Sequence, residues 1–237
     1  MKLHQKLLFA VNALFIAAIL ALNYVYQSHG FDFTLKCTCS GLFALLGVIN
    51  LVYALATKGT KPAFYITMSL GLILAFLGDC LINEDFIIGA ATFALGHIFF
   101  VVAYCILQKI RLLDCAISGG IFLAAAAFLL FCPLLDFGQP IFKAVCLVYA
   151  LIISSMLGKA IGNLIHTPCL YTATVAVASG LFFFSDLMLV LDWFIGLWSW
   201  TDHACMGTYY PALCLLALSM LLRGSDGEGA IHCPTEE

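Results

Sequence analysis

Long apolar stretches, separated by short polar connections, make up most of the chain. Each stretch holds roughly 20 residues with almost no charge, the length that an α-helix needs to cross the hydrocarbon core of a bilayer. The stretches of this kind are Leu7–Gln27, Lys36–Ala56, Pro62–Ile82, Phe86–Gln108, Leu112–Cys132, Pro140–Ile161, Leu170–Phe194 and His203–Leu222. The pattern predicts an all-α fold, a polytopic membrane protein built as a bundle of about eight transmembrane helices.

The two ends of the chain differ in character. The first apolar stretch follows Lys2 and Lys6, as in a signal peptide, but it is too long for one and lacks a small-residue cleavage site. It is therefore predicted to be the first spanning helix. Residues 224–237 are polar and rich in glycine, which is typical of a disordered terminus. We expect one transmembrane domain, residues 1–223, followed by a disordered cytoplasmic tail, residues 224–237.

The composition excludes several classes of protein. Charged residues make up 10% of the chain and hydrophobic residues 64%, whereas soluble domains usually carry about 25% charged residues. The ten Lys and Arg residues are scattered, so the chain offers no basic surface for nucleic acid. The eleven cysteines lie mostly in apolar runs and lack zinc-site spacing. We expect lipid as the partner of most of the surface, with no metal and no cofactor.

Lysine and arginine are divided unequally between the two sets of predicted loops. The set that includes both termini carries Lys2, Lys6, Lys58, Lys61, Lys109, Arg111, Lys159 and Arg223. The other set carries only Lys36 and Lys143. Because basic residues are retained on the cytoplasmic side of a membrane, both termini are predicted to be cytoplasmic.

Two carboxylates, Asp79 and Asp186, lie within predicted spanning helices. An aspartate near the bilayer centre costs about 2.5–3.5 kcal/mol on insertion scales, so both are candidate functional residues. Each lies roughly 25 Å along a helix that runs outward from the predicted cytoplasmic side. This agreement predicts one shared site, in which two close carboxylates would not both ionise easily and would offer an acid beside a base. The alternative is structural, with each aspartate capping a broken helix or bridging two helices.

Four further residues are candidates for binding a substrate around this pair: His97, Tyr149, Ser185 and Tyr209. Tyr209 matches the aspartates in depth, although tyrosines also form the aromatic belt at membrane surfaces. His97 is predicted to lie deeper than the aspartates, and it or Tyr149 could instead be a packing or hydrogen-bonding residue of the bundle. Ser185 precedes Asp186, and because adjacent helical residues point about 100° apart, a serine triad is not predicted.

Short motifs follow one another in a specific order along the chain. They are Thr60-Lys61-Pro62, Leu77-Gly78-Asp79, Phe93-Ala94-Leu95-Gly96-His97, Ser185-Asp186 and Thr208-Tyr209-Tyr210. This order resembles the YhhN-like family, which includes lysoplasmalogenase, and the resemblance covers about residues 60–222. It implies eight helices and hydrolysis of the vinyl ether bond of a lysoplasmalogen, a lysophospholipid taken from the bilayer. The implied products are a fatty aldehyde and glycerophosphoethanolamine or glycerophosphocholine, and the implied catalytic pair is Asp79 and Asp186.

The implied reaction suits two carboxylates. A vinyl ether hydrolyses by protonation of its β-carbon, which leaves an oxocarbenium-like cation that water attacks. The reaction needs a proton donor and a carboxylate that stabilises the cation or orients water, as glycosidases do. Two other classes remain open. Paired intramembrane carboxylates also occur in small-molecule or proton-coupled transporters, although the sequence has no clear internal repeat, and a receptor or scaffold could hold both aspartates for structure.

Overall fold

The computed structural model describes residues 3–30, 32–57, 61–196 and 200–225, and the regular structure in these residues is entirely helical. The helices are α1 (Leu3–Ser28), α2 (Phe33–Ala56), α3 (Pro62–Leu81), α4 (Phe86–Leu107), α5 (Leu112–Phe131), α6 (Pro140–His166), α7 (Leu170–Ile195) and α8 (Thr201–Ser225). Within the described residues, the prediction of eight helices long and apolar enough to span a membrane is confirmed. The predicted tail lies outside the described residues, apart from the end of α8.

Short local signals set where several helices begin and end. Asp32 and Asp85 precede α2 and α4, and each side chain accepts a 3.0 Å hydrogen bond from the backbone N–H three residues later, which satisfies an otherwise unpaired donor. Pro62 and Pro140 lie in the first turns of α3 and α6, where a missing N–H removes no helical hydrogen bond. Gly196 ends α7 with a φ of 62°, a left-handed conformation that glycine adopts without strain.

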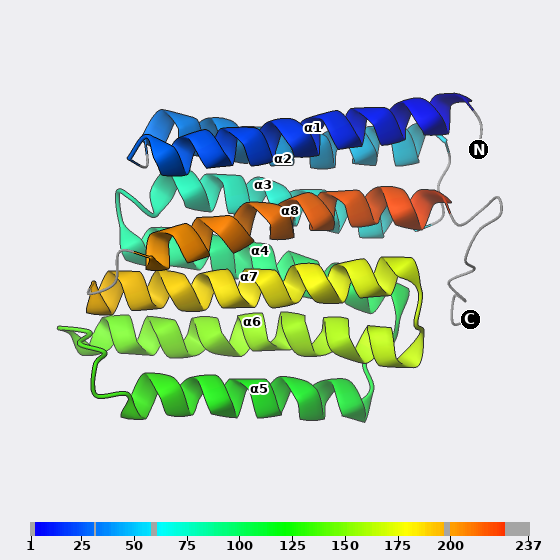
Figure 1. Ribbon diagram of the computed structural model, residues 1–237. Coiled ribbons are helices and arrows are strands. Elements are labelled where there is room, and N and C mark those ends of the chain that lie inside the picture. The colour runs from blue at the N-terminus through cyan, green and yellow to red at the C-terminus, as the bar shows by residue number, and fades with distance from the viewer. Residues whose placement is uncertain (1–2, 31, 58–60, 197–199, 226–237) are drawn as a thin grey trace.

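The helices lie side by side, and α1 begins at the end of the bundle where α8 ends (Figure 1). α8 is the most enclosed helix, since 67% of its apolar stretch is buried against 11% for α5. The end that holds the α1–α2, α3–α4, α5–α6 and α7–α8 connections is here called the acidic end. It carries Asp32, Glu84, Asp85, Asp136 and Asp202. The opposite end is called the basic end, and its assignment to the cytoplasm stays a prediction.

Lys159 is buried inside the bundle, although the sequence placed it among the basic residues of the cytoplasmic side. It is 3% exposed, and α6 continues past it to His166 instead of ending at Ile161. Its Nζ lies 2.7 Å from Oδ2 of Asp114 in α5 and donates a 2.8 Å hydrogen bond to the carbonyl of Lys109. The pairing offsets two charges that would each be costly to bury alone.

α5 approaches α6 closely near the basic end and stands away from the other helices. At Gly158 and Gly162 of α6, an added Cβ would lie 2.2 Å from Oγ of Ser118 and 1.9 Å from Oδ1 of Asp114, so only glycine permits this separation. Among the described residues, α5 makes its close backbone contacts with α6 alone. α5 lies at the edge of the bundle in Figure 1 and, in the described residues, makes no close backbone contact with α4 or α7.

Candidate active site

Asp79 lies in the last turn of α3, where side chains from two other helices surround its carboxylate. Ser40 of α2 and Tyr209 of α8 each donate a hydrogen bond of 2.6 Å to Oδ2. Nζ of Lys36, in the first turn of α2, lies 3.8 Å from Oδ1. With 2% of its surface exposed, Asp79 thus has two hydroxyl donors and a cation, the kind of surroundings that a buried carboxylate requires.

The partners of Asp79 are themselves linked to one another. Lys36 and Ser40 are four residues apart in α2, so they lie on one face of the helix. The hydroxyl of Tyr210 donates a 3.2 Å hydrogen bond to the carbonyl of Lys36 and lies 3.3 Å from Oγ of Ser40. These contacts fix α2, α3 and α8 relative to one another around the carboxylate.

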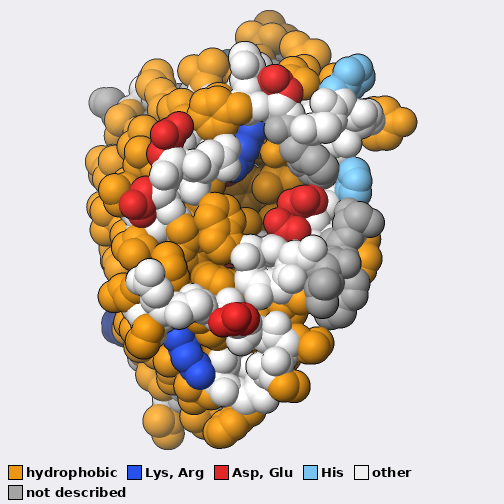
Figure 2. All heavy atoms as spheres, turned by 90° about the vertical axis from the view of Figure 1, so that its left-hand side faces the viewer, with side chains coloured by type: hydrophobic (Ala, Val, Ile, Leu, Met, Phe, Trp, Pro, Cys, Tyr) orange, Lys and Arg blue, Asp and Glu red, His pale blue; other side chains and the backbone are white. Residues whose placement is uncertain are grey.

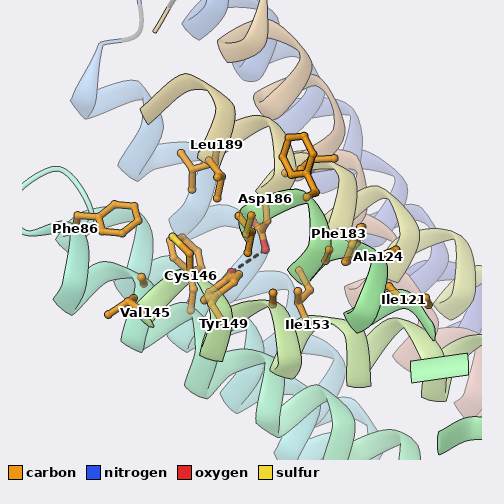
Figure 3. A pocket seen from close by; sticks show the side chains of 18 of the residues that line it. Phe86, Ile121, Ala124, Val145, Cys146, Tyr149, Ile153, Phe183, Asp186 and Leu189 are labelled. Atoms are coloured by element: carbon orange, nitrogen blue, oxygen red, sulfur yellow. Dashed lines mark hydrogen bonds between the residues drawn. The ribbon is translucent and has the colours of Figure 1, made fainter. Parts of the chain in front are cut away.

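Asp186 lies within α7, and residues of α4 and α6 hold one of its oxygens. The hydroxyl of Tyr149 donates a 2.7 Å hydrogen bond to Oδ2, drawn as a dashed line in Figure 3, and Nε2 of His97 lies 3.2 Å from the same atom. The Tyr149 hydroxyl and the His97 Nε2 are 2.8 Å apart. The ring of Phe182 packs edge-on against His97, with centroids 4.6 Å apart. Three helices therefore determine the position of this carboxylate.

A cavity of about 380 Å³ lies beside Asp186 and Tyr149, between α4, α5, α6 and α7 (Figure 3). The other lining side chains are apolar, and alanines on α4, α5 and α6 are among them: Ala90, Ala124, Ala125 and Ala150. The cavity exists because these side chains are small and because α5 stands away from α4 and α7. Its volume lies in the range typical of binding sites for small molecules.

A second, smaller space brings the two aspartates together. Its lining side chains are Lys36, Asp79, Ile82, Phe93, Ser185, Asp186, Leu189, Cys205, Met206 and Tyr209. The volume is about 20 Å³, which is enough for about one water molecule. Ile82, Phe93, Asp186 and Leu189 line the larger cavity as well. Asp186 therefore lies between the small pocket, which holds the charged side chains, and the apolar cavity.

The acidic end of the bundle is hollowed. Figure 2 views this end directly and shows acidic side chains around a central depression, with apolar side chains deeper inside it. The first turn of α2 and the last turn of α3 place Lys36 and Asp79 at this end. The polar part of the site, with Lys36 and Asp79, therefore lies close to the acidic end of the bundle. The apolar cavity lies beside α5.

The candidate residues predicted from the sequence occupy one region. Tyr209 contacts Asp79, while His97 and Tyr149 contact Asp186. Ser185 lines the small pocket, and its hydroxyl has no hydrogen-bond partner among the described residues. His97 is deeper than both aspartates by residue count, as predicted, but it is close enough in depth to contact Asp186. α7 continues nine residues past Asp186, and His97 lies eleven residues into α4, so the two lie at similar distances from the acidic end.

Two members of the site, Lys36 and Ser40, were missed by the sequence reasoning. Lys36 was placed at the first residue of its helix and counted as a loop charge. Because Asp32 caps the helix, α2 begins at Phe33, and Lys36 is 5% exposed inside it. The signal that could have found both residues is a lysine and a serine four positions apart in one spanning helix.

Among the described residues, no group of three or more His, Cys, Asp or Glu side chains is placed to hold a metal ion. A family model described as the YhhN family matches residues 32–220, a range that contains both aspartates and all their contacts described above. No curated protein and no solved structure matches the chain.

Proposed function

The chain belongs to the YhhN family, and from this membership and the geometry of its two aspartates we propose that it is a membrane-embedded hydrolase of lysoplasmalogens. It cleaves the vinyl ether bond and releases a fatty aldehyde and a glycerophospho-base, glycerophosphoethanolamine or glycerophosphocholine. One observation carries the proposal: Asp79 and Asp186 line a single small pocket beside a cavity suited to a hydrocarbon chain.

The direction of the substrate assigns a role to each aspartate. In a vinyl ether, the β-carbon and its hydrocarbon chain lie on one side of the ether oxygen, and the glycerol lies on the other. With the chain in the large cavity, the β-carbon is next to Asp186, which lines both spaces. Asp186 is therefore the proton donor. Asp79, which lines only the small pocket, stabilises the cation and orients the attacking water.

Each step conserves atoms and charge. The Asp186 carboxyl gives its proton to the β-carbon, and the π electrons form the new C–H bond, which leaves an oxocarbenium-like cation. Water adds to the α-carbon and gives a proton to a carboxylate. The hemiacetal hydroxyl then gives its proton to a carboxylate and forms the C=O bond of the aldehyde, while the bond to the glycerol oxygen breaks and this oxygen takes up a proton from a carboxyl group. One water is consumed, and the products are an aldehyde and an alcohol.

The hydrogen bonds around the carboxylates suit this chemistry. Tyr149 and His97 both contact Oδ2 of Asp186, and Ser40 and Tyr209 both contact Oδ2 of Asp79. Oδ1 of each aspartate accepts no hydrogen bond from the described residues. One oxygen is thus used to orient each carboxyl group, and the other is available for proton transfer or for water. Such fixed geometry contributes to catalysis because it needs no rearrangement during the reaction.

The main role of the large cavity is to position the substrate, because it contributes little to the binding free energy. A lipid chain in the bilayer is already surrounded by apolar atoms, so its transfer into an apolar cavity gains little hydrophobic free energy. The shape of the cavity instead selects the position of the vinyl ether relative to Asp186. Proximity of this kind can supply a large part of the rate enhancement of an enzyme.

Aldehyde release by purified protein tests this proposal. The substrate is a 1-O-alkenyl lysophospholipid, and its 1-O-alkyl analogue, which lacks the double bond, is the matched control. We expect aldehyde from the alkenyl compound only. Protein that is folded in detergent and releases no aldehyde would refute the hydrolase and favour a transporter or a scaffold, and uptake of lysophospholipid into proteoliposomes would then separate these two.

A further inference from the structure

Lys36 is a buried cation at the polar side of the site, and the proposed reaction gives it no role. It lies in the first turn of α2, at the acidic end of the bundle, with 5% of its surface exposed. Burial of an ammonium group is costly unless it is paired, so a lysine retained in this position needs a counter-charge. Asp79 provides one, with Nζ and Oδ1 3.8 Å apart.

The contacts of Lys36 leave most of its donor capacity unused. An ammonium group carries three N–H donors. In the described structure, its polar contacts are the ion pair with Asp79 at 3.8 Å and a long hydrogen bond of 3.5 Å to Oδ1 of Asn83. Charge-assisted hydrogen bonds from nitrogen to an anionic oxygen usually measure about 2.7–2.9 Å. The ammonium group can therefore accept a further, closer anionic ligand.

The position of Lys36 matches the place where a phosphate would lie. Lys36, Asp79 and Asp186 line the small pocket, and Asp186 also lines the apolar cavity. The cation, the two carboxylates and the apolar cavity thus follow one another in space. In a lysophospholipid the phosphate, the glycerol with its ether bond, and the hydrocarbon chain follow one another in the same order.

The charges around the hollow favour the same orientation. The outside of this end carries several acidic side chains (Figure 2), which would repel an anion and attract the amine of a zwitterionic head group. The other lysine at this end, Lys143 of α6, lies with its Nζ 6.0 Å from the centre of the Phe137 ring and lines neither space. Among the described residues at this end, Lys36 is thus the basic residue of the pocket.

We propose that Lys36 binds the phosphate group of the lysophospholipid substrate. This inference rests on the proposed function, because it takes the substrate's orientation from it. The small pocket, which has room for about one water molecule, widens when the substrate binds. The phosphate then lies against Nζ of Lys36, the vinyl ether lies between Asp79 and Asp186, and the chain occupies the cavity beside α5. Lys36 is in this account a substrate-binding residue as well as the counter-charge of Asp79.

The experiment measures binding separately from hydrolysis. Two stable ligands share one alkyl chain: a 1-O-alkyl lysophosphocholine, which has the phosphate, and a 1-O-alkylglycerol, which lacks it. We expect wild-type protein in detergent to bind the phosphate compound at least about 10-fold more tightly, since hydrogen bonds to charged groups are among the stronger ones. Equal affinities of the wild-type protein for the two ligands would overturn the proposal whether or not any variant folds.

Three variants test whether Lys36 is the residue that makes the protein bind the phosphate compound more tightly than the alkylglycerol. Lys36→Gln should lose about 10-fold or more in affinity for the phosphate compound and little for the alkylglycerol, whereas Lys36→Arg keeps the preference. Lys143→Met, which removes a positive charge at the same end, should change neither affinity. Equal losses for both ligands in Lys36→Gln would mean that Lys36 acts only through Asp79, which overturns the phosphate site.

The outcomes also separate this inference from the proposed function. If wild-type protein releases no aldehyde but shows a phosphate preference that depends on Lys36, the hydrolase fails and the phosphate site stands. If it releases aldehyde and Lys36→Gln binds the phosphate compound as tightly as wild type does, the phosphate site fails and the hydrolase stands.

Discussion

Tyr209 donates a 2.6 Å hydrogen bond to Oδ2 of Asp79, although 130 residues separate the two in the chain. The bond joins α8, the most enclosed helix, to the last turn of α3. It holds the carboxylate in one orientation at the edge of the small pocket.

Tyr209→Phe removes this hydrogen bond with little change in shape. We expect the rate of aldehyde release to fall about 10-fold or more, because a hydrogen bond to a charged group contributes about 1.5–3 kcal/mol. Tyr24→Phe, in the exposed face of α1 at 75% exposure, is the control and should keep wild-type turnover. Wild-type turnover in Tyr209→Phe itself would remove this hydrogen bond from the mechanism.

Asp79→Asn and Asp186→Asn each keep the size of the side chain but remove the ionisable group. Each should reduce turnover by at least about 10², the lower end for general acid catalysis. The double variant should lose little more, because residues that act as a unit are not additive. Asp136→Asn, on the exposed α5–α6 connection, should be neutral. Turnover is compared per folded protein, and near-normal activity in either variant would exclude that residue.

The same two variants should differ in stability. Asp79→Asn leaves the buried ammonium of Lys36 without its counter-charge, and removing one partner of a buried pair typically costs about 3–5 kcal/mol. In Asp186→Asn, the neutral side chains of Tyr149 and His97 can still form hydrogen bonds with the amide that replaces the carboxylate, so no buried charge is left unpaired. We therefore expect Asp79→Asn to unfold at a clearly lower temperature than Asp186→Asn in the same detergent. The reverse order would show that the ion pair contributes little.

A larger side chain in the cavity should change the preference for chain length. Ala124 and Ala127 of α5 are both exposed, but only Ala124 lines the cavity. Ala124→Phe should reduce the kcat/KM for long alkenyl chains relative to short ones, since it fills space that the chain would occupy. Ala127→Phe is the matched control and should keep the wild-type profile. Equal effects of the two substitutions would argue against the cavity as the chain site.

Native cysteines allow a test of orientation. Cys115 lies exposed in the first turns of α5, near the basic end, and Asp136 lies at the acidic end. If the basic end is cytoplasmic, a membrane-impermeant thiol reagent should label Cys115 only after the cells are opened. In the Asp136→Cys variant, the new thiol should be labelled in intact cells. Labelling of Cys115 in intact cells would invert the predicted topology.

The hydrophobic pattern was sufficient to predict the helices because a spanning helix must satisfy its backbone internally and expose apolar side chains to lipid. The predicted ranges of α3, α4, α5 and α7 differ from the structure by about one residue at most. α6 differs more, since it extends to His166. The hydrophobic pattern could not predict the end of α6, because the last turns of this helix contain polar residues. These residues are packed against α5, where Lys159 pairs with Asp114 and Gly162 allows close contact.

Counting residues along helices placed Asp79 and Asp186 in the same region, but it could not show which side chains meet them. Lys36 illustrates the reason. It was expected at the first residue of its helix, whereas α2 begins three residues earlier, at Phe33, and places Lys36 inside the bundle. Rotation about each helix axis also decides which residues face the site, and nearly uniform hydrophobicity around these helices carries little information on rotation.

Asp114 and Lys159 must enter the bilayer at different moments of synthesis, because they belong to successive helices, α5 and α6. When α5 leaves the translocon alone, the Asp114 carboxylate in its first turn has no counter-charge, and burial of an unpaired charge in apolar surroundings is costly. Once α6 arrives, the two charges neutralise each other, and the glycines of α6 let the helices close. We therefore expect the α5–α6 hairpin to integrate into the bilayer as a pair, since each helix supplies the counter-charge that the other needs.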